Sequence, residues 1–194
     1  MEIGILGGSL NPIHNGHAIL ASYILQNCQL QQLWLMVSPQ NPLKDDFNPA
    51  LDAHRLAMAR LVGDRLPGLV CSDFEFSLPR PSYTYLTLAK LKETYPQHNF
   101  HLIIGADNWL IFNKWKNYEQ ILSDFHVLVY PRPGYEIPKE DSHPNVKFID
   151  APVIDISSTA IRHAVAQGKK ITFSVTSEVE NYIYSHNLYK PSTE

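Results

Sequence analysis

The segment GGSLNPIHNGH, residues 7–17, combines glycines, a proline and histidines in a pattern that suits phosphate chemistry. It directly follows the apolar run at residues 3–6, which predicts a buried strand. Gly7 and Gly8 allow the backbone to turn sharply and to approach a ligand closely. A helix is predicted to begin near Asn15, where its unpaired amide groups and the positive end of its dipole favour an anion. The segment therefore predicts phosphate binding at the start of a helix.

Two histidines of this segment, His14 and His17, are the candidates for chemistry. Their spacing of three places them on one side of the first helical turn, so both can reach the same anion. Imidazole N–H groups can bind phosphate oxygens and stabilise charge that develops there. Gly16 leaves the space between them open, and Pro12 restricts the approach to the helix. A zinc site is the alternative for this spacing, but no third ligand stands obviously beside the pair.

The rest of the chain must position these residues, and its apolar pattern indicates how. Strand-like runs, LVCSDFEF at residues 69–76 among them, alternate with helix-like stretches. This predicts an α/β fold, Rossmann-like and doubly wound, with a mostly parallel sheet and helices on both faces. Ligands of such sheets bind beyond the carboxyl ends of the strands. The glycine turn and the segments SPQNPLK, GADNW and ISSTAIR all follow predicted strands, so we expect them to meet at one edge.

Composition limits the classes of function. The net charge of −3 offers no overall field for polyanions, so nucleic acid is not an expected partner. Cys28 and Cys71 are isolated and are expected to be reduced thiols. No targeting segment is evident, and no apolar run approaches the roughly 18 residues of a membrane helix, so we expect a cytoplasmic protein without a membrane partner. The length predicts a single domain, residues 1–194.

GGSLNPIHNGH resembles the signature of the HxGH nucleotidyltransferases, and specifically of the bacterial nicotinate-nucleotide adenylyltransferases, whose usual form is GG-S/T-FDPxHxGH. Leu10 stands where the family usually has Phe, and Asn11 where it usually has Asp. ISSTAIR, residues 156–162, independently resembles the ISSTxIR motif of the same enzymes. The match continues through VENYIYSHNLY at residues 179–189, so the resemblance covers nearly the whole chain.

The resemblance implies transfer of AMP from ATP to nicotinate mononucleotide, giving deamido-NAD and pyrophosphate. The attacking phosphate oxygen is ionised at neutral pH, so no general base is required, and the protein only has to align the reactants and neutralise charge on the leaving pyrophosphate. ATP and nicotinate mononucleotide are the implied partners. Mg²⁺ is expected to arrive with ATP and not in a protein cage. Formation of a homo-oligomer is left open.

The resemblance also implies which residues serve each substrate. His14 and His17 are the implied catalytic residues, with His17 carrying the transition-state charge. The implied phosphate-binding residues are Gly7, Gly8, Ser9, Lys44, Ser157, Ser158, Thr159 and Arg162. The implied residues for nicotinate mononucleotide are Asn41, Thr84, Tyr85, Gly105, Asp107, Trp115 and Arg132.

Recognition of the pyridine follows from the same resemblance. Backbone amides near Thr84 and Tyr85, at a helix start, would receive the carboxylate, because helix-terminal amides prefer an anion to a neutral amide. Trp115 would stack on the ring and Asp107 would bond sugar hydroxyls, whereas Trp109 is expected to be a packing residue.

Other functions remain open at this point. The acceptor could be nicotinamide mononucleotide or phosphopantetheine, although SYTYLTL and GADNWLIFNKW argue against the latter, shorter enzyme. A non-catalytic nucleotide-binding regulator on the same fold is the alternative from another class, because fold does not determine function.

Overall fold

The protein is built around a parallel β-sheet. The computed structural model describes residues 1–39, 49–136 and 143–191, so the predicted ligands Asn41 and Lys44 lie outside the described residues. Within these ranges six strands form one sheet in the order β3-β2-β1-β4-β5-β6, and every neighbouring pair is parallel. The strands are β1 (Glu2–Gly8), β2 (Gln32–Val37), β3 (Leu69–Ser72), β4 (Asn99–Gly105), β5 (His126–Tyr130) and β6 (Val146–Phe148).

Helices cover both faces of the sheet, which confirms the predicted α/β class. They are α1 (Asn15–Asn27), α2 (Pro49–Gly63), α3 (Thr84–Thr94), α4 (Ala106–Trp109), α5 (Tyr118–Asp124), α6 (Ser158–Ala166) and α7 (Ser177–Ser185), with short 3-10 helices η1 (Phe74–Ser77) and η2 (Phe112–Lys114). Buried side chains of α1, α2, α6 and α7 share one core cluster, and those of α3 and α5 share the other. No helix within the described ranges combines the length and apolarity needed to cross a membrane.

Strand β1 shows how the sequence builds these two cores. Successive side chains of a strand point to opposite faces of the sheet. Ile3 and Ile5 accordingly belong to the cluster that contains Leu88 of α3, and Leu6 belongs to the cluster that contains Ile24 of α1. A strand that is buried on both faces reads as a continuous apolar run, and EIGIL has this pattern.

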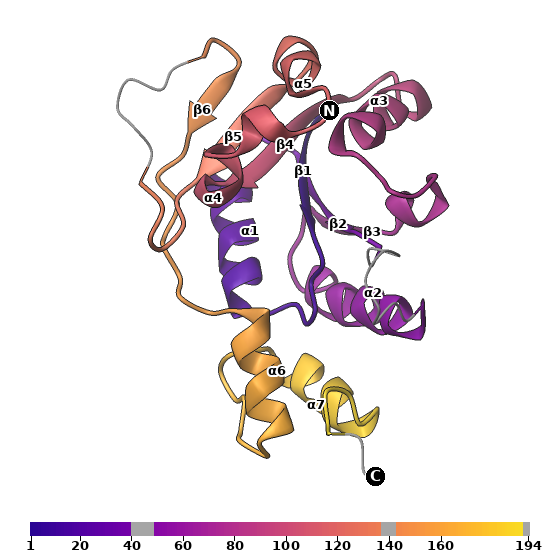
Figure 1. The fold of residues 1–194 in the computed structure, drawn as a ribbon, viewed down its shortest axis with the longest axis vertical. Coiled ribbons are helices and arrows are strands. Elements are labelled where there is room, and N and C mark those ends of the chain that lie inside the picture. The colour runs from indigo at the N-terminus through magenta and orange to yellow at the C-terminus, as the bar shows by residue number, and fades with distance from the viewer. Residues whose placement is uncertain (40–48, 137–142, 192–194) are drawn as a thin grey trace.

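The order of the strands indicates at which edge of the sheet a ligand binds. From β1 the chain moves outward to β2 and β3, then returns to pair β4 with β1 and continues outward to β5 and β6. Ligands of doubly wound sheets bind where this direction reverses, beyond the carboxyl ends of the strands. The turn after β1 lies at this edge, and α6 and α7 lie beyond the end of β1 (Figure 1).

One predicted strand is wrong in part. We expected residues 69–76 to be extended, but β3 ends at Ser72 and η1 comes next. The hydroxyl of Ser72 accepts the N–H of Phe74, and the N–H of Phe76 bonds to the carbonyl of Asp73, which turns the chain. The side chain of Glu75 is buried as a result of this turn.

Candidate active site

The turn after β1 leads directly into α1, and His14 is the N-cap of that helix. His14 has extended backbone dihedrals and is 7% exposed. A Cβ atom at Gly16 would stand 3.0 Å from the His14 ring, so glycine is the residue that leaves room for this ring. The ring centroids of His14 and His17 are 3.8 Å apart. The two histidines therefore meet at the helix start, as the sequence predicts.

The hydrogen bonds of the pair indicate which nitrogens can donate. The backbone N–H of His14 donates to Nδ1 of His17 at 3.2 Å. Since Nδ1 of His17 is an acceptor here, the neutral ring carries its proton on Nε2. Nδ1 of His14 is buried and has no hydrogen-bond partner among the described residues. A ligand oxygen at this point would satisfy a nitrogen that otherwise costs free energy.

Burial controls the protonation of both histidines. Burial, with the charge of Arg132 nearby, lowers the pKa of His14 to about 4. Burial also lowers the pKa of His17 to about 3, with smaller contributions from His14 and Arg132. Both rings are therefore neutral at pH 7 in the free protein, so each carries one ring N–H that can donate without a full charge.

These pKa values predict that stability falls in mild acid. The unfolded histidine has a pKa of about 6.5, above both folded values, so the unfolded state binds more protons below that pH. Stability is then greatest above pH 6.5 and falls as the pH drops toward 4, by about 2 kcal/mol for His14 alone between pH 7.5 and 5. The prediction is checked by measuring the thermal unfolding of the unchanged protein and of His14→Gln across this pH range. An equal pH dependence in both proteins would contradict the assignment.

Side chains from α2 and α6 hold the loop between β1 and His14. The guanidinium of Arg55 donates to the carbonyl of Ser9. Oγ of Ser158 donates to the carbonyl of Pro12 at 2.8 Å, and Nη1 of Arg162 donates to the carbonyl of Asn11 at 2.7 Å. The ISSTAIR helix start is therefore in direct contact with the loop that precedes His14, although 146 positions separate Ser158 from Pro12.

The other two hydroxyl residues of the motif bond within their own helix start. Oγ of Ser157 accepts the N–H of Ala160 at 3.1 Å and caps α6. Oγ1 of Thr159 accepts from Nη2 of Arg162 at 3.2 Å. The motif thus orders its own helix start as well as the neighbouring loop.

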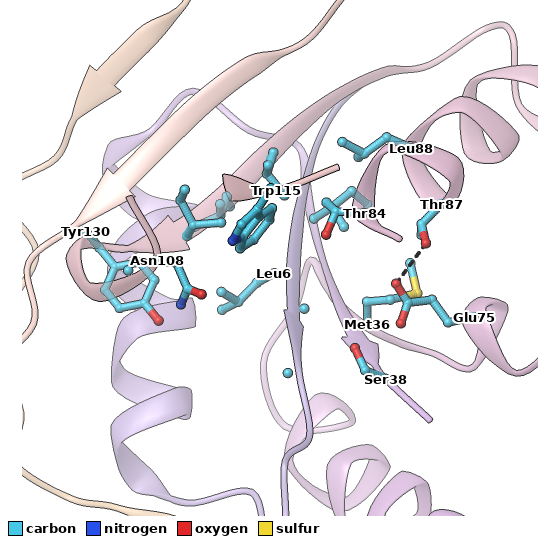
Figure 2. A pocket seen from close by; sticks show the side chains of 17 residues that line it. Leu6, Met36, Ser38, Glu75, Thr84, Thr87, Leu88, Asn108, Trp115 and Tyr130 are labelled. Atoms are coloured by element: carbon cyan, nitrogen blue, oxygen red, sulfur yellow. Dashed lines mark hydrogen bonds between the residues drawn. The ribbon is translucent and has the colours of Figure 1, made fainter. Parts of the chain in front are cut away.

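A cavity of about 210 Å³ opens beside the glycine turn, and we call it the central cavity. It is lined by the ends of β1 and β4 and by the start of α3, with Gly7, Gly8, Thr84, Gly105 and Trp115 among its residues. In Figure 2, Tyr130 and Asn108 lie at one end of the row of side chains and Glu75 and Thr87 at the other, with Trp115 and Thr84 between them. The cavity thus combines an aromatic ring with the first turn of a helix.

The buried pair Glu75 and Thr87 connects two walls of the central cavity. Oγ1 of Thr87 donates to Oε1 of Glu75 at 2.9 Å (Figure 2). Thr87 is 2% exposed and Glu75 is 9% exposed. The bond joins η1 to the first turn of α3, so it fixes where the amides of that turn lie.

A second depression contains the histidines, and we call it the histidine cleft. It is lined by His14, Gly16, His17 and Arg132, together with apolar residues of the segment 152–156. Tyr130 lines both the histidine cleft and the central cavity. The two spaces are therefore neighbours that share one lining residue.

Gly105, Asp107 and Arg132 form a compact group between β4 and β5. Nε of Arg132 lies 3.4 Å from Oδ1 of Asp107. A Cβ atom at Gly105 would collide with both side chains, so glycine is required for this approach. The pair places a guanidinium at the histidine cleft and a carboxylate at the start of α4.

The structure separates the predicted site residues into groups. The central cavity and the histidine cleft together collect Gly7, Gly8, His14, His17, Thr84, Gly105, Trp115 and Arg132. The half-buried side chain of Tyr85 instead packs against a core cluster and lines neither space. Trp109 is a packing residue as predicted, with its ring centroid 5.4 Å from that of Phe112.

Sequence reasoning missed several residues of the central cavity, namely Ser38, Glu75, Thr87, Asn108 and Tyr130. Asn108 directly follows the predicted ligand Asp107, and Tyr130 stands two residues before Arg132, so position in the motif was a usable signal for both. Glu75 gave no such signal, because it stands in a segment that reads as a strand. Within the described ranges, no three His, Cys, Asp or Glu side chains are grouped so as to hold a metal ion.

Comparison of the sequence with known proteins shows the family to which the chain belongs. The cytidylyltransferase-like family model matches residues 5–164. A Bacteroides fragilis protein named "Probable nicotinate-nucleotide adenylyltransferase" is 48% identical over 172 residues, which cover 89% of this chain and 86% of that protein. A Flavobacterium johnsoniae protein of the same name is 44% identical over 192 residues, which cover 98% of this chain and 100% of that protein.

A solved structure agrees in fold. The nicotinic acid mononucleotide adenylyltransferase of Plasmodium falciparum, complexed with NaAD, superposes with a TM-score of 0.81 and covers 97% of each chain at 20% identity. At 20% identity this similarity shows the fold alone. The family is shown by the bacterial relatives, which are 44–48% identical in sequence. The chain belongs to the cytidylyltransferase-like family and, within it, to the nicotinate-nucleotide adenylyltransferases.

Proposed function

We propose that this enzyme transfers AMP from ATP to nicotinate mononucleotide, with the histidine cleft holding the ATP phosphates and the central cavity holding the pyridine. The reaction yields deamido-NAD and pyrophosphate and belongs to NAD biosynthesis. The observation that carries the proposal is the adjacency of the two spaces, because Tyr130 lines both. An acceptor in one space can then attack a phosphate in the other.

The chemistry requires alignment more than proton transfer. A phosphate oxygen of nicotinate mononucleotide forms a bond to the α-phosphorus of ATP, and the bond from that phosphorus to the bridging oxygen of the β-phosphate breaks. The leaving pyrophosphate keeps the electron pair. The attacking oxygen is already ionised, so the neutral rings of His14 and His17 are not needed as bases. Their role is to donate hydrogen bonds to oxygens on which charge develops.

The phosphate side of the proposal rests on the first turn of α1. Nε2 of His17 is the nitrogen left to donate, and Nδ1 of His14 is buried beside it. Arg132, which the resemblance gave to nicotinate mononucleotide, lies in the same cleft, so we assign its guanidinium to the phosphates, beside its ion pair with Asp107. We take Mg²⁺ to arrive as the companion of ATP, bound by its phosphates and water, and Lys44 as a further phosphate ligand.

The pyridine side of the proposal rests on Trp115 and the first turn of α3. Nicotinate mononucleotide carries a carboxylate on its ring, and the amides near Thr84 and Tyr85 start a helix, which favours an anion over a neutral amide. Trp115 lines the same cavity and can stack on the ring. This arrangement supports the acid as substrate over nicotinamide mononucleotide.

Thr87→Val is expected to weaken binding of nicotinate mononucleotide without affecting ATP. The change removes the hydroxyl that bonds Glu75 and so loosens the first turn of α3. We expect the KM for nicotinate mononucleotide to rise about fivefold, in line with a loss of about 1 kcal/mol for one hydrogen bond. Steady-state kinetics with each substrate varied in turn measures this.

The matched control for this variant is Thr94→Val. Oγ1 of Thr94 bonds the carbonyl of Lys90 at the exposed far end of the same helix. We expect its KM values to match those of the unchanged protein. An equal rise in both variants, or a rise in the KM for ATP alone, would remove Glu75 and Thr87 from the pyridine site.

The proposed reaction is tested directly by the fate of the α-phosphate. ATP labelled at that position should transfer its label to a product that contains the pyridine ring, with one pyrophosphate released for each product formed. Label that stays in free AMP would indicate hydrolysis. Label that stays in ATP with every acceptor, despite nucleotide binding, would favour a regulator on this fold.

A further inference from the structure

The loop that leads from β1 to His14 makes a contact that the proposed reaction does not use. We call residues 9–13 the catalytic loop. Its carbonyl groups at Ser9, Asn11 and Pro12 are bonded by Arg55, Arg162 and Ser158. A further hydrogen bond reaches the side chain of Asn11 from the last part of the described chain.

Tyr189 makes this contact from the C-terminal segment. Its hydroxyl donates to Oδ1 of Asn11 at 2.7 Å, across 178 positions of the sequence. Tyr189 belongs to the VENYIYSHNLY motif, to which the sequence pattern alone assigns no function. Asn11 offers this acceptor without the negative charge that the family's usual Asp would place beside the phosphates.

The backbone around Tyr189 is arranged to deliver the hydroxyl. Tyr189 has a φ of 62° and Asn187 a φ of 52°, both in the left-handed region that side chains rarely adopt. Such a conformation persists only where the surroundings enforce it. The N–H of Leu188 bonds to the carbonyl of Ile183 at 3.0 Å, and the ring of Tyr189 packs against the core cluster of α1 and α2.

Burial keeps the hydroxyl of Tyr189 protonated, and therefore a hydrogen-bond donor. Burial raises the pKa of the phenol well above its usual value, and the nearby Arg162 and Arg55 only partly oppose this. The group therefore stays protonated across the neutral range. Its bond to Asn11 does not depend on pH there.

We propose that Tyr189 is a positioning residue for adenylyl transfer: by fixing the side chain of Asn11, it fixes the catalytic loop and, through it, His14 and His17. The inference rests on the proposed function, because it assigns Tyr189 to the step that those histidines serve. Only two residues, Pro12 and Ile13, separate Asn11 from His14, and Ile13 is fully buried. A shift in the position of Asn11 therefore shifts the backbone of His14, the N-cap of α1, by nearly the same distance.

The test compares Tyr189→Phe with Tyr182→Phe, which removes a different hydroxyl from the same C-terminal segment. The hydroxyl of Tyr182 lies 2.9 Å from Nδ1 of His54 and joins α7 to α2, and no hydrogen bond within the described ranges joins it to the catalytic loop itself. For Tyr189→Phe we expect kcat to fall about tenfold with both KM values within about twofold, because small displacements of reacting groups cost rate. For Tyr182→Phe we expect an unchanged kcat. Thermal unfolding should shift equally in the two variants.

A double-mutant cycle shows whether Tyr189 acts through Asn11. In the Asn11→Ala background, Tyr189→Phe should cause no further loss of kcat. A second tenfold loss there, an unchanged kcat in Tyr189→Phe, or an equal loss in Tyr182→Phe would each overturn the inference. The unchanged protein is assayed alongside. If it transfers no adenylyl group, the proposed function fails as well. If it turns over and the variants do not behave as expected, only the role of Tyr189 is overturned.

Discussion

His17→Ala is expected to lower kcat by about 10²- to 10³-fold, the loss typical of removing one donor to a charge that develops in the transition state. Nδ1 of His17 accepts the backbone N–H of His14, so its Nε2 is left to donate to the phosphate. Because this bond strengthens as charge moves onto the leaving group, its loss should appear in kcat, with the KM for nicotinate mononucleotide nearly unchanged. Steady-state pyrophosphate release measures both.

Two further variants separate this role from a structural one. His17→Asn keeps an N–H donor on a shorter side chain and should recover part of the lost rate. His126→Ala changes a histidine at the start of β5, at the opposite edge of the sheet, and should leave turnover unchanged. Full turnover by His17→Ala would remove this residue from the chemistry.

Trp115→Ala is expected to lower kcat/KM for nicotinate mononucleotide by about 10- to 100-fold, because stacking of an aromatic side chain on a base contributes about 1–3 kcal/mol. Trp115 lines the central cavity between the glycine turn and α3. The pyridine ring also carries a positive charge on its nitrogen, which strengthens its attraction to the indole face. The loss should fall mainly on KM, as measured with nicotinate mononucleotide varied at saturating ATP.

The companion variant for this position is Trp115→Phe, which keeps an aromatic face of smaller area. Its loss should be less than that of Trp115→Ala, and neither variant should change the KM for ATP by more than about twofold. A larger rise in the KM for ATP than in the KM for nicotinate mononucleotide would place Trp115 in the ATP-binding part of the site and contradict its assignment to the pyridine.

Local patterns in the sequence were sufficient for the fold and for the histidine pair. The apolar run of β1 predicts a strand that is buried on both faces, and the two glycines at its end predict a sharp turn. His14 and His17 are close in the chain, so helical spacing alone brings them together, and the space beside His14 requires Gly16. These conclusions needed no knowledge of distant contacts.

The contacts that hold the site could not be predicted from the sequence, because they join residues that are far apart in the chain. Nothing local indicates that Ser158 and Arg162 would bond the loop of Pro12 and Asn11, or that the hydroxyl of Tyr189 would do so too. The buried Glu75 was hidden for a different reason. The alternation in FEF fits a strand, and only the turn at Ser72 shows that the chain leaves the sheet there.

These contacts change the interpretation of the ISSTAIR motif. The resemblance implies that Ser158, Thr159 and Arg162 hold the pyrophosphate end of ATP. The structure shows Ser158 and Arg162 bonded to the catalytic loop, and Thr159 bonded to Arg162. A guanidinium can serve both partners because it has five N–H donors, so Arg162 can order the loop and still meet a phosphate.

In the proposed reaction, one site brings the α-phosphate of ATP to the phosphate group of nicotinate mononucleotide and holds the pyridine ring in the central cavity. The most direct measurement is pyrophosphate release by the purified protein with Mg-ATP and, in parallel, nicotinate mononucleotide, nicotinamide mononucleotide or phosphopantetheine. We expect a large kcat/KM preference for the nicotinate compound, which would support both the reaction and carboxylate recognition at the start of α3. Equal or greater turnover of another acceptor would contradict that substrate, and no pyrophosphate release with any of the three would contradict the reaction itself.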